Sequence, residues 1–160
     1  MWRIIAYFVL VSFVGIGGGI GVGFYFFPIA FPPPIANESL DPSELLAVIA
    51  TGRFINTNKL DPVHRGAGSV TVLQRTVFLG SDFEVSPGPK FHVYLVPKEM
   101  VRRARDVKNT DFIDLGPLRA FKGSQKYTIP ATINITEYKS VVIWNAVFGF
   151  LVSPADLKFL

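Results

Sequence analysis

The sequence contains no cysteine among its 160 residues. This absence excludes disulfide bonds, thiolate metal sites, cysteine-held iron–sulfur clusters, thiol nucleophiles and lipid attachment through an N-terminal cysteine. Cysteine usage therefore gives no information about the compartment in which the protein folds.

Histidine is almost as scarce, with two residues, His64 and His92. His64 lies in a turn-like stretch, and His92 lies in a stretch with strand-like alternation. A metal site built on both would need a third ligand, for which Asp61 and Asp82 are the candidates. Because nothing in the spacing brings these residues together, we predict no metal site. We expect His64 to hydrogen-bond within its turn and His92 to lie on a strand face.

Signatures of catalysis and of nucleotide binding are also missing from the sequence. It has no G-x-S-x-G elbow, H-E-x-x-H helix or Walker loop. The stretch "GIGGGIGVG" matches a loose G-x-G-x-x-G pattern, but it lies within an apolar run with no strand before it. A net charge of +4 is too small to argue for nucleic acid. We therefore predict no cofactor, no catalytic residue and no nucleic-acid partner.

Charge is absent from Ile4 to Phe27, a run longer than the roughly 20 apolar residues that cross a bilayer as a helix. Arg3 precedes the run, acidic residues follow it, and the next basic residue is Arg53. The positive-inside rule then places the N-terminus in the cytoplasm and the rest outside. We predict an uncleaved signal anchor over residues 1–27 that contacts the membrane through this run. A cleaved signal peptide is the alternative, with an unusually long apolar region.

A proline-rich linker follows the apolar run, and a single domain follows the linker. Five of the chain's 12 prolines lie between Pro28 and Pro42. Such a segment is expected to be stiff and extended. We predict that residues 28–44 form a spacer that lifts a domain at 45–160 off the membrane.

The domain consists of short strand-like segments separated by turns that contain glycine and proline, a pattern typical of an all-β fold. In residues 90–96, apolar and other side chains alternate with period two. We predict one antiparallel β-sandwich or barrel-like domain after one transmembrane helix. The expected strands are 50–55, 68–74, 76–80, 90–96, 111–116, 125–130 and 140–152. The segments expected to be helical are 41–50, 97–109 and 153–160.

Asn145 interrupts the most strand-like stretch of the chain, residues 140–152. Asparagine is depleted in strands and rarely buried without partners. We expect its amide to hydrogen-bond to backbone or to a ligand beside the strand, unless it faces solvent at a bulge. Four aromatic residues have two interpretations, a ligand-lining face or ordinary core and cross-strand packing. They are Tyr94, Tyr127, Tyr138 and Trp144.

The segment from Lys98 to Lys108 is the most basic part of the chain. It could contact anionic lipid headgroups or envelope polymers. The simpler interpretation, which we favour, is a solvated excursion between two strands.

Most of the domain resembles a known family. The segments "GRFINTNKLDPVHRGAGSVTVLQ", "SDFEVSPGPKFHVYLVP", "DFIDLGPLRAFKGSQKYTIP" and "YKSVVIWNAVFGFLVSPADL" occur in the order and spacing of the DM-thirteen domain, also called the Skeletor-type electron-transfer domain. The resemblance covers about residues 50–157. The matching elements are Gly88-Pro89, "VYL", Leu115-Gly116, Leu118, Gly123-Ser124-Gln125, Tyr127, Pro130, "VVIW" and Phe148.

The resemblance implies a compact, β-rich extracytoplasmic domain. In this family the residue after "VVIW" is typically a cysteine, on which the proposal of electron transfer rests. Here that residue is Asn145, which can form neither a thiolate nor a sulfenic acid. His64 and His92 stand where family members often carry histidine.

Our leading hypothesis is a membrane-anchored binding module with no enzymatic activity, facing the periplasm or the cell exterior. It would recognise a small molecule, an envelope component or a partner protein through a surface with Asn145, Trp144, His92 and His64. The alternative is an electron-transfer accessory that uses a bound cofactor or metal in place of the cysteine. An enzyme whose chemistry leaves no motif is the third hypothesis. The lack of cysteine and the short anchor favour a bacterial source.

Overall fold

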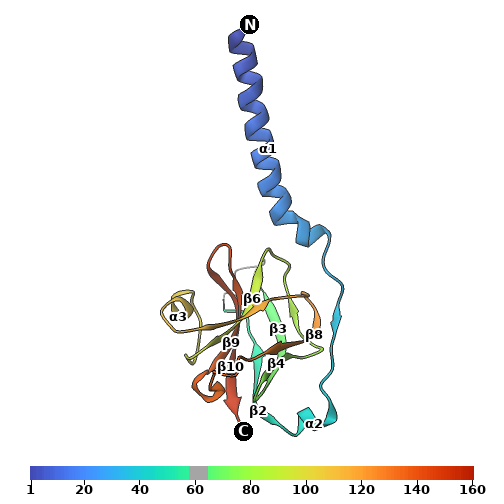
Figure 1. Cartoon of the computed structure of the whole chain (residues 1–160), viewed down its shortest axis with the longest axis vertical. Helices are drawn as coiled ribbons and strands as arrows, with labels where there is room; N and C mark the ends of the chain where they lie inside the picture. The colour runs from blue at the N-terminus through green and yellow to red at the C-terminus, as the bar shows by residue number, and fades with distance from the viewer. Residues whose placement is uncertain (58–64) are drawn as a thin grey trace.

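A computed structural model describes residues 1–57 and 65–160 of the chain. A long helix stands apart from a β domain, and an extended segment connects the two (Figure 1). The elements are α1 (Trp2–Ala30), β1 (Ala36–Asn37), α2 (Pro42–Leu45), β2 (Val48–Phe54), β3 (Gly66–Leu73), β4 (Thr76–Leu79), β5 (Glu84–Val85), β6 (Phe91–Val96), α3 (Arg105–Lys108), β7 (Ile113–Pro117), β8 (Gly123–Thr128), a 3-10 turn (Ile135–Glu137), β9 (Ser140–Asn145) and β10 (Phe150–Phe159).

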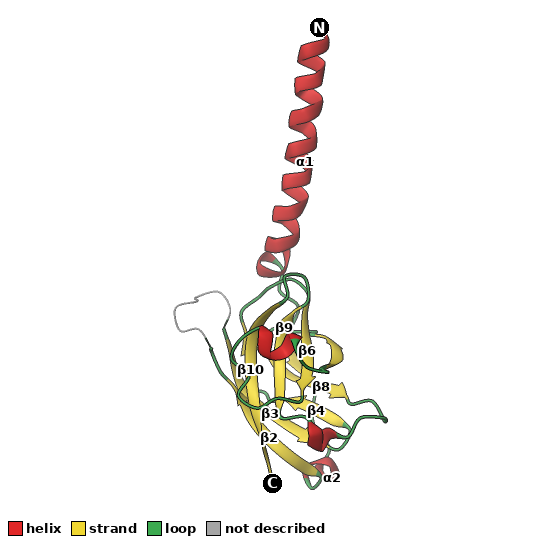
Figure 2. Cartoon of the chain, turned by 90° about the vertical axis from the view of Figure 1, so that its left-hand side faces the viewer, coloured by secondary structure: helices red, strands yellow, loops and turns green. Residues whose placement is uncertain are grey.

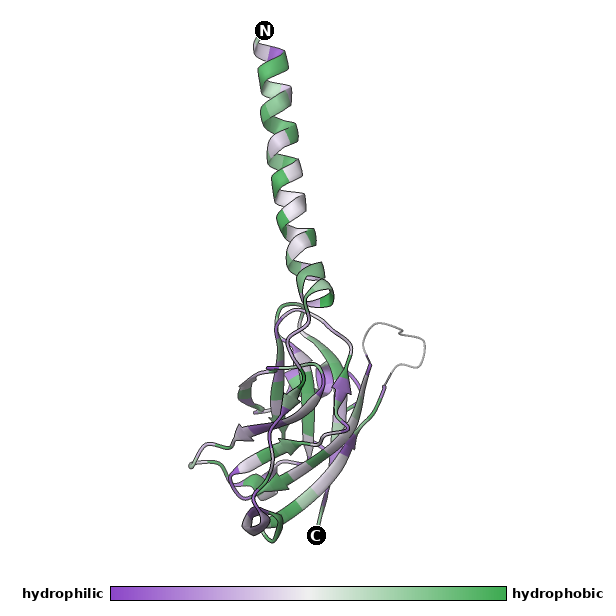
Figure 3. Cartoon of the chain, turned by 90° about the vertical axis from the view of Figure 1, so that its right-hand side faces the viewer, coloured by the Kyte–Doolittle hydropathy of each residue, from purple (hydrophilic) through white to green (hydrophobic). Residues whose placement is uncertain are grey.

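Helix α1 contains the uncharged run and has no buried side chain. In the view of Figure 3 it is coloured green to near-white beyond its first turn, in keeping with the uncharged sequence. The helix is long and apolar enough to cross a membrane. This property is shared by signal anchors and signal peptides.

The strands form one 10-stranded sheet in the order β1-β8-β4-β3-β2-β10-β9-β6-β7, with β5 paired to β3. Among the described strands, β1 and β8 pair in parallel and the other neighbours are antiparallel. The sheet curls into a half-barrel (Figure 2). This confirms a mainly antiparallel, barrel-like β domain after one apolar helix. The described strands belong to a single curled sheet and not to the two facing sheets of a sandwich.

The half-barrel has a hydrophobic cluster on each side of the sheet. Val93 of β6 and Ile143 of β9 belong to the large inner core. Their chain neighbours Tyr94 and Trp144 belong to a smaller outer cluster. The outer cluster also contains Val107 of α3, so the chain between β6 and β7 covers this face. The predicted period-two alternation is therefore present, but both faces of β6 and β9 are buried.

Two predictions for the C-terminal part of the chain are wrong. Residues 140–152 are not one strand, because β9 ends at Asn145 and β10 begins at Phe150. Residues 153–160 are not helical, because β10 continues to Phe159. In this segment Ala155 and Leu157 contact the inner core, so the side chains alternate with strand periodicity. The Ser-Pro pair at its start imitates a helix N-terminus, which explains the error.

The other two segments predicted to be helical contain only one helical turn each. In residues 41–50 the helix is Pro42–Leu45, and strand β2 begins at Val48. In residues 97–109 the helix is Arg105–Lys108.

The proline-rich linker lies against the domain along part of its length. The carboxylate of Glu38 accepts a hydrogen bond from the backbone N–H of Lys126 at 2.8 Å. The backbone N–H of Glu38 donates to the carbonyl of Ser124 at 3.1 Å. Further along, the ammonium of Lys126 pairs with Glu44 at 2.7 Å. Residues 36–44 therefore lie along the β8 edge of the half-barrel, and we call them the strap. The strap is the segment that descends beside the domain in Figure 1.

Candidate functional site

Two of the predicted site residues, His92 and Trp144, are neighbours on adjacent strands and lie on the outer side of the sheet. In the register of β6 against β9, His92 is the partner of Trp144. On its other side β6 pairs with β7, where His92 opposes Pro117 and Tyr94 opposes Asp114. An irregularity between these two pairs shifts the register. Asp114 can thereby reach His92 along the edge of the sheet.

The imidazole of His92 is held by the carboxylate of Asp114. The Nδ1 atom of His92 lies 2.8 Å from Oδ2 and 3.0 Å from Oδ1 of Asp114. Asp114 is itself fixed, because its Oδ1 accepts a hydrogen bond from the backbone N–H of Gly116 at 2.8 Å. Since an ionised carboxylate only accepts hydrogen bonds, Nδ1 carries the proton and neutral His92 presents Nε2 as an acceptor. No donor among the described residues bonds to Nε2.

An aromatic layer lies next to His92. The rings of Tyr94 and Phe112 stack with centroids 4.5 Å apart, and Tyr94 lies 6.1 Å from Trp144. The ammonium of Lys108 lies 5.8 Å from the centre of a Trp144 ring. Phe112 is 37% exposed, whereas Tyr94 and Trp144 are buried. Burial, with a smaller effect of the Asp114 charge, raises the pKa of Tyr94, so its phenol stays protonated at neutral pH.

Asp106 holds the segment that covers this layer. Its carboxylate accepts hydrogen bonds from the Lys98 ammonium at 2.6 Å and from the backbone N–H groups of Arg102 and Arg103 at 3.1 and 3.0 Å. These bonds, with that from Lys98 the strongest, lower the pKa of Asp106 to about 2. The Arg102 guanidinium forms a forked ion pair with Asp156 of β10. Part of the basic segment 98–108 is thus engaged in fixing the loop to the sheet.

Asn145 is buried at the end of β9, where both its amide oxygen and its amide nitrogen bond to backbone. Its Oδ1 accepts hydrogen bonds from the N–H groups of Val147 and Phe148 at 3.0 and 2.9 Å. Its Nδ2 donates to the carbonyl of Pro89 at 3.2 Å. Asn145 is 1% exposed. Of the alternatives left open above, bonding to neighbouring backbone is the one observed, and this bonding shapes the β9–β10 turn.

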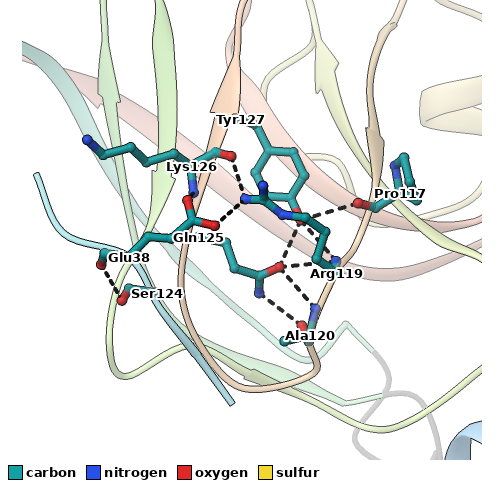
Figure 4. Close-up of polar contacts among 8 residues, drawn as sticks. All are labelled: Glu38, Pro117, Arg119, Ala120, Ser124, Gln125, Lys126 and Tyr127. Atoms are coloured by element: carbon teal, nitrogen blue, oxygen red, sulfur yellow. Dashed lines mark hydrogen bonds and ion pairs between the residues drawn. The ribbon is translucent and has the colours of Figure 1, made fainter. Parts of the chain in front are cut away.

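A buried polar network near the β8 edge has no counterpart in the sequence predictions (Figure 4). Gln125 is completely buried, and its Oε1 accepts hydrogen bonds from the N–H groups of Arg119 and Ala120, each at 3.1 Å. The Tyr127 hydroxyl donates to the same oxygen at 2.9 Å. Arg119 also pairs with Glu38 of the strap at 2.8 Å. Burial raises the pKa of Tyr127, which keeps this hydroxyl protonated as a donor.

The network ties the β7–β8 connection and the strap to the edge of the half-barrel. Because every polar atom named above is bonded within the protein, we assign it a structural role. A single glutamine in a strand gives no sequence signal of such a network, since its partners come from a loop that only the fold brings close.

The remaining predicted site residues do not gather with His92 and Trp144. His64 lies outside the described residues. Tyr127 and Tyr138 belong to the inner core, on the opposite side of the sheet from Tyr94 and Trp144. Sequence reasoning missed Asp114 and Phe112, and it placed Lys108 only in the basic segment 98–108 and not beside Trp144. The available signal for Asp114 was an acidic residue within the predicted strand 111–116. Its contact with His92 could not be predicted, because this contact depends on the register shift between β6 and β7.

The described residues contain no group of three or more His, Cys, Asp or Glu side chains placed to hold a metal ion. His92 and Asp114 together would supply two ligands, fewer than the three or four of a typical protein site. What this surface offers chemically is a histidine acceptor, an exposed aromatic edge and a lysine ammonium.

Comparison with known proteins assigns the chain to a family without identifying a close relative. No curated protein and no solved structure matches the chain significantly. The model of one family, described as electron transfer DM13, matches residues 59–155. This match spans more than half of the 160 residues and includes β3 to β9, with His92, Trp144 and Asn145. The resemblance to the DM-thirteen domain is thereby confirmed, and the chain belongs to the DM13 family.

Proposed function

We propose that this chain is a single-pass membrane protein whose DM13 domain lies on the extracytoplasmic side and works as a non-enzymatic binding module. Helix α1 would serve as the anchor, with Arg3 on the cytoplasmic side. The binding surface would be the uncovered margin of the outer side of β6 and β7, where His92, Phe112 and Lys108 reach solvent beside the loop that covers the rest. We name it the His92 face and define it by His92, Phe112, Asp114, Trp144 and Lys108.

The observation that carries this proposal is the bonding of Asn145. The resemblance above places it at the family's characteristic cysteine. In this chain that position holds an amide that is buried and bonded at both ends to backbone. It therefore has no thiol for redox exchange, and its buried amide is held by backbone and not presented to a ligand in solvent. This favours a role for the adjacent surface that requires no electron transfer at residue 145.

The His92 face suggests what kind of ligand it would take. The Nε2 atom of neutral His92 is available to accept a hydrogen bond, the exposed part of Phe112 offers an apolar face, and Lys108 supplies a positive charge. A fitting ligand would combine a hydrogen-bond donor with a planar or apolar group, and would carry an acidic group for the lysine. A small molecule or an exposed segment of an envelope protein can have these features.

Electron transfer through a bound cofactor is the second candidate function, and the family description favours it. A cofactor would have to bind without cysteine ligation, and His92 would be its nearest candidate ligand. The two functions differ in one measurable property, the presence of a group that absorbs visible light or changes redox state.

Site-specific photocrosslinking in the native membrane tests the binding proposal. A photoreactive phenylalanine derivative at Phe112 would sit on the His92 face. The same derivative at Phe159 is a matched control, because both side chains are 37% exposed. We expect a discrete adduct at residue 112 that is weaker at residue 159 and reduced by His92→Ala. Equal labelling at both positions, or no effect of His92→Ala, would remove the support for this face.

A further inference from the structure

We infer that the β9–β10 turn, residues 146–149, inserts into the lipid headgroup region of the membrane that α1 crosses. The domain would then have a second membrane contact beside its anchor. The inference rests on the membrane anchoring proposed above and adds a lipid-binding surface on the domain itself.

Strand register places this turn at the end of the half-barrel nearest α1. The strap enters at this end, where Ala36 pairs with Gly123 at the start of β8. From β8 the pairing continues through β4, β3, β2, β10 and β9 to β6, and each pair is antiparallel. The start of β8 therefore lies at the same end of the sheet as the start of β6, where Phe91 pairs with Asn145. The β9–β10 turn follows directly after Asn145. The end of α1 and this turn lie at the same end of the domain in Figure 1.

The short connection to α1 keeps this end close to the bilayer. Helix α1 ends at Ala30, and the strap pairs with β8 from Ala36 onward. A chain extends at most about 3.6 Å per residue, so these two residues are separated by no more than about 22 Å. An apolar groove of about 640 Å³ between the end of α1 and the domain is lined by Phe27, Pro89 and Phe121, among others.

The turn has the composition of an interfacial membrane contact. Val147 and Phe148 are 45% and 56% exposed, unlike the buried strand residues before them. Lys90 and Lys108 are exposed and lie beside the turn: the Lys90 carbonyl accepts a hydrogen bond from the N–H of Ala146 at 3.1 Å, and the Lys108 ammonium lies next to Gly149. Within the described part of the chain, neither lysine has a carboxylate at ion-pair distance. Exposed apolar side chains suit the boundary between the headgroups and the acyl chains of a membrane. Lysine ammonium groups without a carboxylate partner suit the anionic headgroups.

The turn is also rigid in the conformation that presents these side chains. Asn145 bonds to the N–H groups of Val147 and Phe148, and the N–H of Gly149 donates to the Asn145 carbonyl at 2.9 Å. Gly149 has a φ of 65°, a conformation that glycine adopts without strain. A turn already ordered in this way loses little conformational entropy when it binds.

The lack of cysteine makes the test direct, because any single cysteine introduced is the only thiol. We would attach a nitroxide spin label to Phe148→Cys, or to Val147→Cys if the first variant folds poorly. The full chain would be placed in nanodiscs of phosphatidylcholine and phosphatidylglycerol. Ala131→Cys is a control on an exposed loop at the other end of the domain, and Ser12→Cys reports on α1. The measurement is the ratio of label accessibility to oxygen and to a water-soluble nickel complex.

We expect the label at residue 148 to have an oxygen-to-nickel ratio several-fold above that at residue 131, and below that at residue 12. If residue 12 is in the acyl region but residues 148 and 131 give equal ratios, the lipid contact is refuted while the anchor stands. If residue 12 is itself exposed to water, α1 does not span the bilayer, and the proposed anchoring and this inference both fail.

Discussion

At the scale of single residues, Asn145 explains why a strand-like sequence breaks where it does. The apolar run before it forms β9, and its short amide side chain then folds back to bond the next N–H groups. Asparagine favours such turns because its side chain can imitate a backbone carbonyl. The same residue also bonds to Pro89 in the segment before β6. One side chain thus fixes a turn and joins it to the neighbouring segment.

Replacing Asn145 with alanine is expected to destabilise the domain by about 1–3 kcal/mol. The reason is that the buried carbonyl of Pro89 and the N–H groups of the turn lose their partner. Chemical denaturation of the full chain in detergent measures the loss. Asn109→Ala is the control, because Asn109 is an exposed asparagine. Equal stability of the two variants would show that the Asn145 bonds contribute little.

His92 is expected to be the Nδ1–H tautomer when neutral. Asp114 accepts a hydrogen bond from Nδ1, which fixes the proton on that nitrogen. Nitrogen-15 NMR of histidine-labelled protein distinguishes the tautomers, and Asp114→Asn should shift the population towards Nε2–H. A dominant Nε2–H form in the wild-type protein would contradict the proposed acceptor on the His92 face.

The part of the site that sequence could predict is the part that depends on local pattern. His92 and Trp144 were identifiable because each lies in a recognisable strand. Asp114 and Phe112 were not, because their proximity to His92 depends on a shifted register and a loop conformation. The burial of Gln125 was hidden for the same reason, since Arg119 and Ala120 reach it only through the fold.

At the scale of elements, the excursion between β6 and β7 covers the outer sheet face, and Asp106 is one of the two carboxylates that hold it. The pKa of Asp106 is about 2, below the ordinary value of about 3.9. A lowered folded-state pKa means that ionised Asp106 stabilises the fold fully only above about pH 5, roughly one unit above its ordinary pKa. This contribution is lost as the pH falls from about 5 through 2.

We therefore expect the stability difference between wild type and Asp106→Asn to be constant above about pH 5 and to shrink towards pH 2. Urea unfolding monitored by Trp144 fluorescence, in a Trp2→Phe background, measures this difference. Trp144 is a suitable reporter because it packs in the same cluster as Val107 of α3. A stability difference that does not change between pH 5 and pH 2 would contradict the role assigned to Asp106.

The strap along β8 is expected to depend on Glu38. Its carboxylate bonds both the Lys126 N–H and the Arg119 guanidinium, each at 2.8 Å. Glu38→Ala should cost about 1 kcal/mol and speed amide exchange at Lys126. Exchange measured by mass spectrometry or NMR tests this, with the exposed Glu99→Ala as control. If exchange at Lys126 does not change, the strap does not depend on Glu38.

The elements that sequence predicted well are the strands with strong alternation, such as 90–96. The prediction failed where local signals conflict, as in residues 153–160. There a Ser-Pro pair suggests a helix start, while the alternation of Ala155 and Leu157 with charged residues indicates a strand. Pairing with β2 and β9 on both sides favours the strand, and this pairing is a property of the whole sheet.

At the scale of the whole molecule, α1 and the β domain are joined by a segment that is itself partly docked. The chain leaves the helix at Ala30 and is paired to β8 by Ala36. The domain is therefore held close to the helix end and is not displaced by the full length of the proline-rich segment. This arrangement fits the proposed role at a membrane surface.

Visible absorbance of the native protein distinguishes binding without electron transfer from electron transfer through a bound cofactor. The full chain would be purified from its native membrane without denaturation, and its visible absorbance and metal content measured before and after addition of a reductant. We predict a colourless protein with no stoichiometric metal and no spectral change on reduction. A stoichiometric chromophore or metal that changes reversibly with redox state would contradict the account, and would make His92 and His64 the first residues to replace.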